Sequence, residues 1–81
     1  MQINGARPFS WTPRELEVFL LLAQTRTFRR TAEQVHLSQS AVSRQISSLG
    51  ESLKVSLFHR HARGLRLTEH GELVYRTSQE V

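Results

Sequence analysis

The stretch that constrains the fold most strongly is residues 38–53, SQSAVSRQISSLGESL, because it carries two faces of opposite character. Its apolar side chains recur with the period of an α-helix, and they are Val42, Ile46, Leu49 and Leu53. The opposite side carries short or forked hydrogen-bonding side chains without a carboxylate, namely Gln39, Ser40, Ser43, Arg44, Ser47 and Ser48. The pattern predicts a helix that buries one stripe in a core and offers a polar face to a groove of DNA.

Length and charge point to one small domain with a polyanionic partner. The chain has 81 residues, enough for a single core, and a net charge of +4. The excess lies in the middle, where residues 26–66 hold eight cations against two carboxylates. Ten of the eleven cations are arginine, whose planar fork suits phosphate and guanine. Nucleic acid is the favoured partner, and the alternative is a basic surface that is only solvated.

Several other function classes are disfavoured by what the sequence lacks. The chain has no cysteine, which removes disulfides, thiolate zinc sites and cysteine nucleophiles and fits a reducing cytosol. The longest apolar run, residues 18–23, is far shorter than the roughly 20 residues of a spanning helix. No nucleophile with a base, carboxylate pair or glycine-rich phosphate loop is visible, so we expect no enzyme.

The four histidines predict no metal site. His59 and His61 are two residues apart and could approach one ion from a strand. No cysteine or aspartate exists in the chain to complete a ligand set. His36 and His70 lack a partner at a telling spacing, and we expect both on the surface.

The first helix has a clear predicted start. Thr12 is the expected N-cap, followed by Pro13 at the first position and Glu15 to close a capping box. Trp11 is placed to pack on Leu16, and the apolar pattern continues to about residue 25. Residues 1–11 show no such pattern, and we expect a disordered or vector-derived leader there.

Two further caps predict a helix-turn-helix. Thr27 begins a short helix ending at residues 34–36, and Ser38 begins the long helix described above. About three residues join the two, as in helix-turn-helix motifs. Arg29 and Arg30 lie in the first turn of the short helix, where the macrodipole disfavours cations. They either meet an external anion or point into water.

A β-hairpin and a last helix follow. The segments VSLFHR and LRL alternate on either side of a turn at residues 62–64, which predicts a wing with an arginine-rich tip. We expect Leu57 and Phe58 in the core rather than in a site. Thr68 is the expected cap of the last helix, with Glu69 in its first turn.

Three spaced motifs together resemble the N-terminal winged helix-turn-helix of LysR-type transcriptional regulators. They are Ser38 and Gln39 followed by Val42 to Ile46 (VSRQI), then Leu57 and Phe58 with Arg60, then Leu67 and Thr68 with Gly71. The resemblance covers about residues 16–81. It implies a mainly α fold with a small β-hairpin: a winged helix-turn-helix over residues 12–67, and the start of a linker helix over residues 68–81. It also implies a bacterial, cytoplasmic and nucleoid-associated regulator whose effector domain is absent from this chain.

The expected DNA contacts divide into bases, backbone and wing. Base contacts are expected from Gln39, Ser40, Ser43 and Arg44. Arg44 lies about 140° around the helix from Gln39, so it would reach the bases from the flank. Backbone contacts are expected from Arg29, Arg30, Ser38, Gln45 and Arg60. Arg63 and Arg66 would approach the minor groove from the wing, although Arg66 could instead point into solvent.

The resemblance also implies partners. In the family, linker helices pair two subunits so that two recognition helices enter successive major grooves of an interrupted inverted repeat. Here the contact residues would be Leu73, Val74, Tyr75 and Val81, in a homodimer or, for the full-length protein, a tetramer. A small-molecule inducer is expected for the missing effector domain, and no cofactor for this chain.

Two departures from the family pattern lie at the end of the long helix. Where the family usually has Leu-Glu and Leu-Gly, this chain has Leu49-Gly50 and Leu53-Lys54. Glycine inside a helix costs about 1 kcal/mol relative to alanine. Lys54 replaces the residue best suited to a left-handed C-cap. The helix is therefore expected to end somewhere between Leu49 and Leu53.

Two alternatives remain open at this point. A winged helix can dock a protein on its polar face instead of a DNA groove, and salt dependence separates the two. The related domain of molybdate-responsive regulators also resembles this helix-turn-helix, and sequence beyond Val81 would decide between the families.

Overall fold

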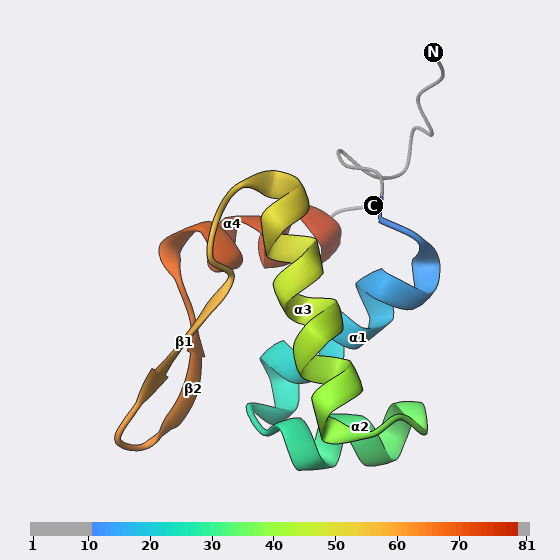
Figure 1. The fold of residues 1–81 in the computed structure, drawn as a ribbon. Helices are drawn as coiled ribbons and strands as arrows, with labels where there is room; N and C mark the ends of the chain where they lie inside the picture. Colours follow the sequence, from blue (N-terminus) through green and yellow to red (C-terminus); the bar gives the residue numbers. More distant parts are fainter. Residues whose placement is uncertain (1–10, 80–81) are drawn as a thin grey trace.

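The computed structural model describes residues 11–79, which form a winged helix-turn-helix (Figure 1). The elements follow in the order α1 (Pro13–Thr25), α2 (Phe28–Val35), α3 (Gln39–Leu53), β1 (Phe58–His61), β2 (Gly64–Leu67) and α4 (Glu69–Gln79). Helices α1, α2 and α3 pack on one another, and the hairpin of β1 and β2 projects from one side. Helix α4 packs against α1 and β2. The predicted class, mainly α with a small hairpin, is confirmed.

Each helix begins at the N-cap that the sequence predicts. Thr12 accepts from the backbone of Glu15, whose carboxylate accepts from the Thr12 N–H at 2.8 Å, so the capping box is complete. The hydroxyls of Thr27 and Ser38 cap α2 and α3 by accepting from the N–H groups of Arg30 and Ala41, without the reciprocal half of a capping box. The hydroxyl of Thr68 accepts from the third residue of α4 at 2.9 Å. Local side-chain chemistry therefore sets all four helix starts within residues 11–79.

Trp11 corrects the predicted boundary of the leader. Its side chain is only 2% exposed, and its ring packs edge-on against Phe19 with centroids 5.3 Å apart. The indole Nε1 donates to Ser52 Oγ at 3.3 Å. The leader expected over residues 1–11 was therefore one residue too long, because a large ring beside a helix start is buried with that helix. Residues 1–10 lie outside the described residues.

The core is organised around α1. The ring of Phe19 is fully buried and makes edge contacts with Trp11, Phe58 and Tyr75, with centroids 5.3, 5.6 and 6.5 Å apart. The other buried apolar residues are Val18, Leu22, Ala32, Val35, Val42, Ile46, Leu49, Leu57 and Leu65. Three of them belong to the predicted four-residue stripe of α3, whose last member, Leu53, is half-buried. Leu57 is in the core as predicted, and Phe58 packs against it half-buried.

Helix α3 continues through Gly50 and ends at the later of the two predicted limits. Lys54 takes the left-handed conformation, with φ 61° and ψ 36°. Its N–H bonds the carbonyl of Glu51, and the N–H of Val55 bonds that of Gly50, both at 3.0 Å. This pair of bonds is the Schellman motif, so Lys54 serves as the C-cap despite its side chain.

Gly50 is required by close packing of the backbone. A Cβ at this position would lie 2.6 Å from the carbonyl oxygen of Val55. The chain turns back over the helix at this point. Glycine leaves room for the Val55 carbonyl here, although its helix propensity is low. Gly71 in α4 is a second such position, because its Cβ would lie 2.1 Å from the carbonyl oxygen of Leu57.

The hairpin is shorter than predicted. It pairs Phe58 with Leu67 and His61 with Gly64, so the loop is residues 62–63 and the strand does not begin at Val55. Val55 is held instead by the Schellman motif. The carbonyl of Leu57 accepts from the Thr68 N–H at 3.0 Å, so it joins the wing to the start of α4.

Replacing Lys54 with glycine should stabilise the fold. An L-residue in the left-handed conformation costs about 1–2 kcal/mol, which glycine avoids in part. We expect Lys54→Gly to raise the melting temperature by roughly a few degrees in thermal unfolding followed by circular dichroism. An unchanged or lower melting temperature would contradict the assigned conformation.

Gly50→Ala should have the opposite effect. The added methyl group meets a backbone oxygen that cannot rotate away, and such overpacking costs about 1–3 kcal/mol. The control is Ser48→Ala, an exposed position of the same helix where alanine improves helix propensity without a clash. We expect the melting temperature to fall for Gly50→Ala and not for the control. A rise for Gly50→Ala would show that the approach of Val55 is not tight.

Candidate nucleic-acid interface

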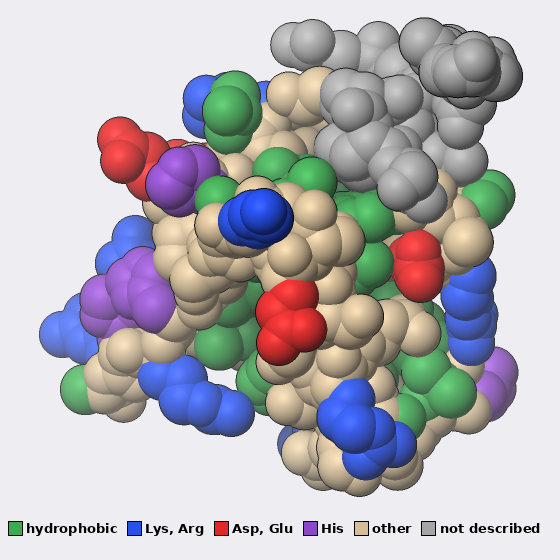
Figure 2. Space-filling view, turned by 45° about the horizontal axis from the view of Figure 1, so that its top comes forward, with side chains coloured by type: hydrophobic (Ala, Val, Ile, Leu, Met, Phe, Trp, Pro, Cys, Tyr) green, Lys and Arg blue, Asp and Glu red, His purple; other side chains and the backbone are tan. Residues whose placement is uncertain are grey.

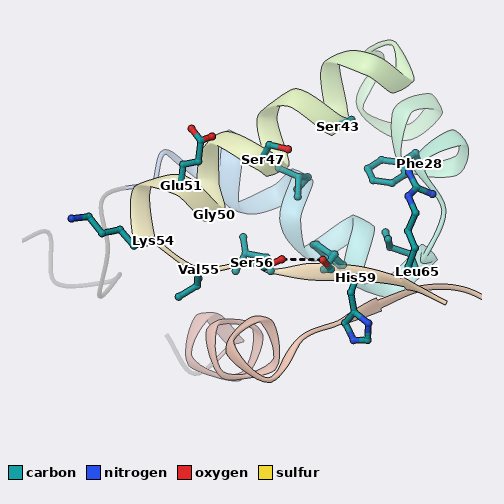
Figure 3. Close-up of a pocket in the computed structure, with 14 residues that line it drawn as sticks. Phe28, Ser43, Ser47, Gly50, Glu51, Lys54, Val55, Ser56, His59 and Leu65 are labelled. Carbon is teal, nitrogen blue, oxygen red and sulfur yellow. Dashed lines mark hydrogen bonds between the residues drawn. The ribbon is translucent and has the colours of Figure 1, made fainter.

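The exposed face of α3 carries the predicted base-contacting set. Gln39, Ser40 and Arg44 are exposed, and Ser43 is half-buried. Figure 3 shows Ser43 and Ser47 on the side of α3 that faces the segment leading into the wing. The first carboxylate of the helix is Glu51, in its second half. The first half therefore presents donors and acceptors without a negative charge that would repel phosphates.

Two of the predicted backbone contacts, Ser38 and Gln45, are not fully available to a phosphate, the first because of hydrogen bonds and the second because of burial. Ser38 Oγ accepts from the Ala41 N–H at 3.0 Å and lies 3.3 Å from Ser40 Oγ. Gln45 is half-buried, and its Oε1 is buried without a hydrogen-bond partner among the described residues. A phosphate only accepts hydrogen bonds, so Gln45 would have to use Nε2.

Arg29 and Arg30 are both exposed at the start of α2. Arg29 forms an ion pair with Glu33 one turn later, at 3.7 Å. The two side chains are 71% and 67% exposed, so the pair contributes less than about 1 kcal/mol and can exchange for a phosphate. Arg29 therefore has an intramolecular partner that neither expectation, an external anion or solvent alone, included.

The wing is joined to α2 through Arg60. Its guanidinium lies over the ring of Phe28, 5.3 Å from the centroid, which is cation–π geometry. Arg60 pairs opposite the buried Leu65, whereas Arg66 pairs opposite His59. Alternate strand residues point to opposite faces, so Arg60 and Arg66 lie on different sides of the hairpin.

Two hollows flank the wing on the side of the helix-turn-helix. The larger, about 700 Å³, lies between the second half of α3 and the segment through His59 (Figure 3). The smaller, about 380 Å³, brings together the cations Arg26, Arg29 and Arg60 with Gln39 and His61. Arg26 was absent from the predicted site, although it is the first residue of the basic segment.

A third hollow, about 310 Å³, lies against the other face of the hairpin. Arg66 lines it with Arg26, His59, His61 and Glu72. The rings of the two histidines are 4.3 Å apart. Within residues 11–79 no group of three or more potential ligands is arranged to hold a metal ion. Arg66 thus points toward α1 and α4, and the loop residue Arg63 is the better placed of the two wing arginines.

The surface shows where these charges gather. In Figure 2, blue and purple side chains cover the hairpin at the left of the view, and further blue patches lie away from it. Of the wing residues, His59, Arg60, His61, Arg63 and Arg66 are all exposed.

Within residues 11–79, no helix combines the length and apolar composition needed to cross a bilayer.

The predicted dimer residues do not form one exposed stripe. Leu73 is 55% exposed. Val74 and Tyr75 are half-buried and pack against the core of their own chain, the latter through Phe19. Val81 lies outside the described residues. Intramolecular packing therefore uses part of the surface of Val74 and Tyr75, and their contact with a second subunit stays a prediction.

The sequence matches the family described as "Bacterial regulatory helix-turn-helix protein, lysR family" over residues 13–72, which is most of the chain. The chain belongs to the LysR family. It corresponds to the N-terminal DNA-binding domain of that family, so the alternative of a molybdate-responsive regulator is set aside. The LysR assignment confirms the resemblance carried by the three sequence motifs.

Relatives and solved structures agree with this assignment. The LysR-family domain is 45% identical over 58 residues to the HTH-type transcriptional activator IlvY of Haemophilus influenzae, covering 72% of this chain and 20% of IlvY. A crystal structure of the BenM_DBD/catB site 1 DNA complex superposes with TM-score 0.79 at 27% identity, over 86% of this chain and 79% of that one. DarR of Vibrio fischeri, also in complex with DNA, gives 0.80 at 30% identity, over 89% and 25%.

The curated relatives are named as transcriptional activators or regulators. The chain spans about a fifth of the length of the curated relatives that it matches.

Proposed function

We propose that this domain binds duplex DNA sequence-specifically, with α3 in the major groove and the wing beside the minor groove. One observation carries the proposal: α3 buries Val42, Ile46 and Leu49 while its first half exposes Gln39 and Arg44 without a carboxylate. A helix anchored on one side and polar on the other fits the width of the major groove.

Base recognition is assigned to Gln39, Ser40, Ser43 and Arg44. Gln39 can bond adenine N6 and N7, and Arg44 can bond guanine O6 and N7, each pair discriminating by about 1–3 kcal/mol. Because Ser43 faces the wing, we expect it to contact bases of the DNA strand that would run between α3 and the hairpin.

Backbone contacts are assigned to Arg29, Arg30, Ser38, Gln45 and Arg60. Such contacts position the domain without carrying sequence information. Arg60 is preorganised by Phe28, so little side-chain freedom is lost when it binds a phosphate. Arg63 at the loop is proposed to enter the minor groove. Arg66, on the hairpin face opposite Arg60, is proposed to attract the DNA through its charge alone.

The solved complexes support this function. The BenM domain and DarR were each crystallised with DNA, and the curated relatives are transcriptional regulators. By analogy, the protein containing this domain works in the bacterial cytoplasm on chromosomal DNA. We propose that an effector domain outside this chain responds to a small-molecule inducer.

A homodimer on an interrupted inverted repeat completes the proposal. In this proposal α4 is the start of the linker helix, and among residues 11–79 Leu73 is the large apolar side chain left exposed. A second copy would cover Leu73 together with the exposed parts of Val74 and Tyr75, and Val81 would extend the contact. A tetramer of the full-length protein is compatible with this arrangement.

The competing function is docking of a protein on the polar face. Phosphate contacts release counterions, so log K should fall with log salt by about 0.9 per phosphate neutralised. A steep slope supports DNA binding, and binding of a protein with little salt dependence would support the alternative.

Arg44→Ala and Arg60→Ala should lower DNA affinity in different ways. On a preferred duplex and a set of single base-pair variants of it, Arg44→Ala should lose preference at one position of each half-site, by about 1–3 kcal/mol. Arg60→Ala should weaken binding to every duplex by a similar factor, because a phosphate contact is independent of sequence.

Fluorescence anisotropy titrations on this duplex set measure both effects. If both variants lose affinity equally on all duplexes, the proposed division between bases and backbone is wrong.

A further inference from the structure

We propose that Arg26 and Arg60 together bind a single phosphate of the DNA backbone, in the smaller hollow between the α1–α2 turn, the start of α3 and the wing. The inference rests on the proposed DNA binding. It adds Arg26, the C-cap of α1, to the residues that contact the DNA backbone. One phosphate held from both sides would fix the wing relative to the recognition helix on the duplex.

The charges that line the hollow are all of one sign. Arg26, Arg29 and Arg60 line it, and no carboxylate does. Neither Arg26 nor Arg60 forms an ion pair within residues 11–79. His61 lines the same hollow and adds a ring N–H donor. Of the three arginines, Arg29 pairs with the exposed Glu33, so Arg26 and Arg60 leave an excess of positive charge that is complementary to an anion.

Both arginines project from backbone that is fixed by the core. Arg26 is the C-cap of α1, with φ 62°, and its N–H bonds the carbonyl of Leu22 at 2.8 Å. Arg60 lies opposite the buried Leu65 and over the ring of Phe28. Both side chains therefore start from fixed backbone beside one hollow, and Phe28 also orients the Arg60 guanidinium before any ligand arrives, which lowers the entropy cost of binding.

The position of the hollow favours a phosphodiester of DNA over a free anion. Gln39, the first residue of α3 and an expected base contact, lines the same space. An anion here would lie beside the base-contacting end of α3 and beside the wing at once. A backbone strand that leaves the major groove toward the wing supplies a phosphate at that place. Inorganic phosphate has the same chemistry, so the experiment must separate the two.

The test variant is Arg26→Gly, which separates folding from binding. Glycine favours the left-handed conformation that Arg26 adopts, so the variant should fold with an equal or higher melting temperature. It should bind duplex DNA several-fold more weakly than wild type, with a smaller dependence of affinity on salt. The matched control is Lys54→Gly, which removes the same charge from the same backbone conformation at the far end of α3. Lys54→Gly should keep affinity and salt slope close to wild type.

A double variant tests whether the two arginines share one phosphate. Arg26→Gly, Arg60→Gln and their combination are titrated with one duplex at several salt concentrations. If the phosphate is shared, the combined variant should lose no more than about 0.9 from the slope of log K against log salt. A loss of about 1.8, with the single losses adding, would show two separate phosphates and overturn the proposal.

Three further outcomes are decisive. If Arg26→Gly matches Lys54→Gly in affinity and slope, the inference fails while DNA binding stands. If the folded wild-type domain binds no duplex, both proposals fail. At constant ionic strength, about 10 mM inorganic phosphate should leave the DNA affinity of the wild-type domain unchanged. If phosphate displaces DNA from the wild-type domain but not from Arg26→Gly, the hollow is a site for free anions and the proposal is overturned.

Discussion

The arrangement of the domain depends on the burial of one ring, Phe19 of α1. Trp11, Phe58 and Tyr75 each place a ring edge against or near it, and they come from the chain before α1, from the wing and from α4. Edge-to-face contacts of this kind add about 0.5–1.5 kcal/mol each beyond area burial. Phe19 therefore connects elements that are distant in sequence, and the wing keeps a defined position relative to the helix-turn-helix because of it.

A second constraint acts through the backbone at the exit of α3. Gly50 admits the carbonyl of Val55, Lys54 reverses the chain, and Gly71 admits the carbonyl of Leu57. Carbonyl oxygens cannot change rotamer, so these approaches fix the separation of α3, the wing and α4 more rigidly than side-chain packing would. The exposed residues at the start of α3 and those of the wing are consequently presented to a ligand as one preorganised surface.

Features that depend on a few neighbouring residues could be predicted from the sequence. The capping hydroxyls of Thr12, Thr27 and Ser38 act within one turn, so the helix starts were predicted correctly. The apolar stripe of α3 was predicted for the same reason, since its period is local.

Features that arise from tertiary contacts could not be predicted in the same way. The segment that begins at Val55 alternates like a strand, but the Val55 N–H forms part of the C-terminal cap of α3. Trp11 precedes α1 in the chain and is buried against it. Tyr75 looks free on its own helix but meets Phe19 across the core. Arg26 became a candidate site residue only when the fold brought it beside the wing. The charge excess of residues 26–66 was the one sequence observation that pointed to it.

The central claim, that the first half of α3 recognises bases in duplex DNA, is tested most directly by selecting bound sequences from a pool of random duplexes. We expect enrichment of one short half-site, recurring as an inverted repeat when two copies bind. We also expect this enrichment to disappear in a folded variant with Gln39, Ser43 and Arg44 all replaced by alanine. Binding without enrichment in the wild-type domain, or the same half-site selected by the triple variant, would contradict base recognition by α3.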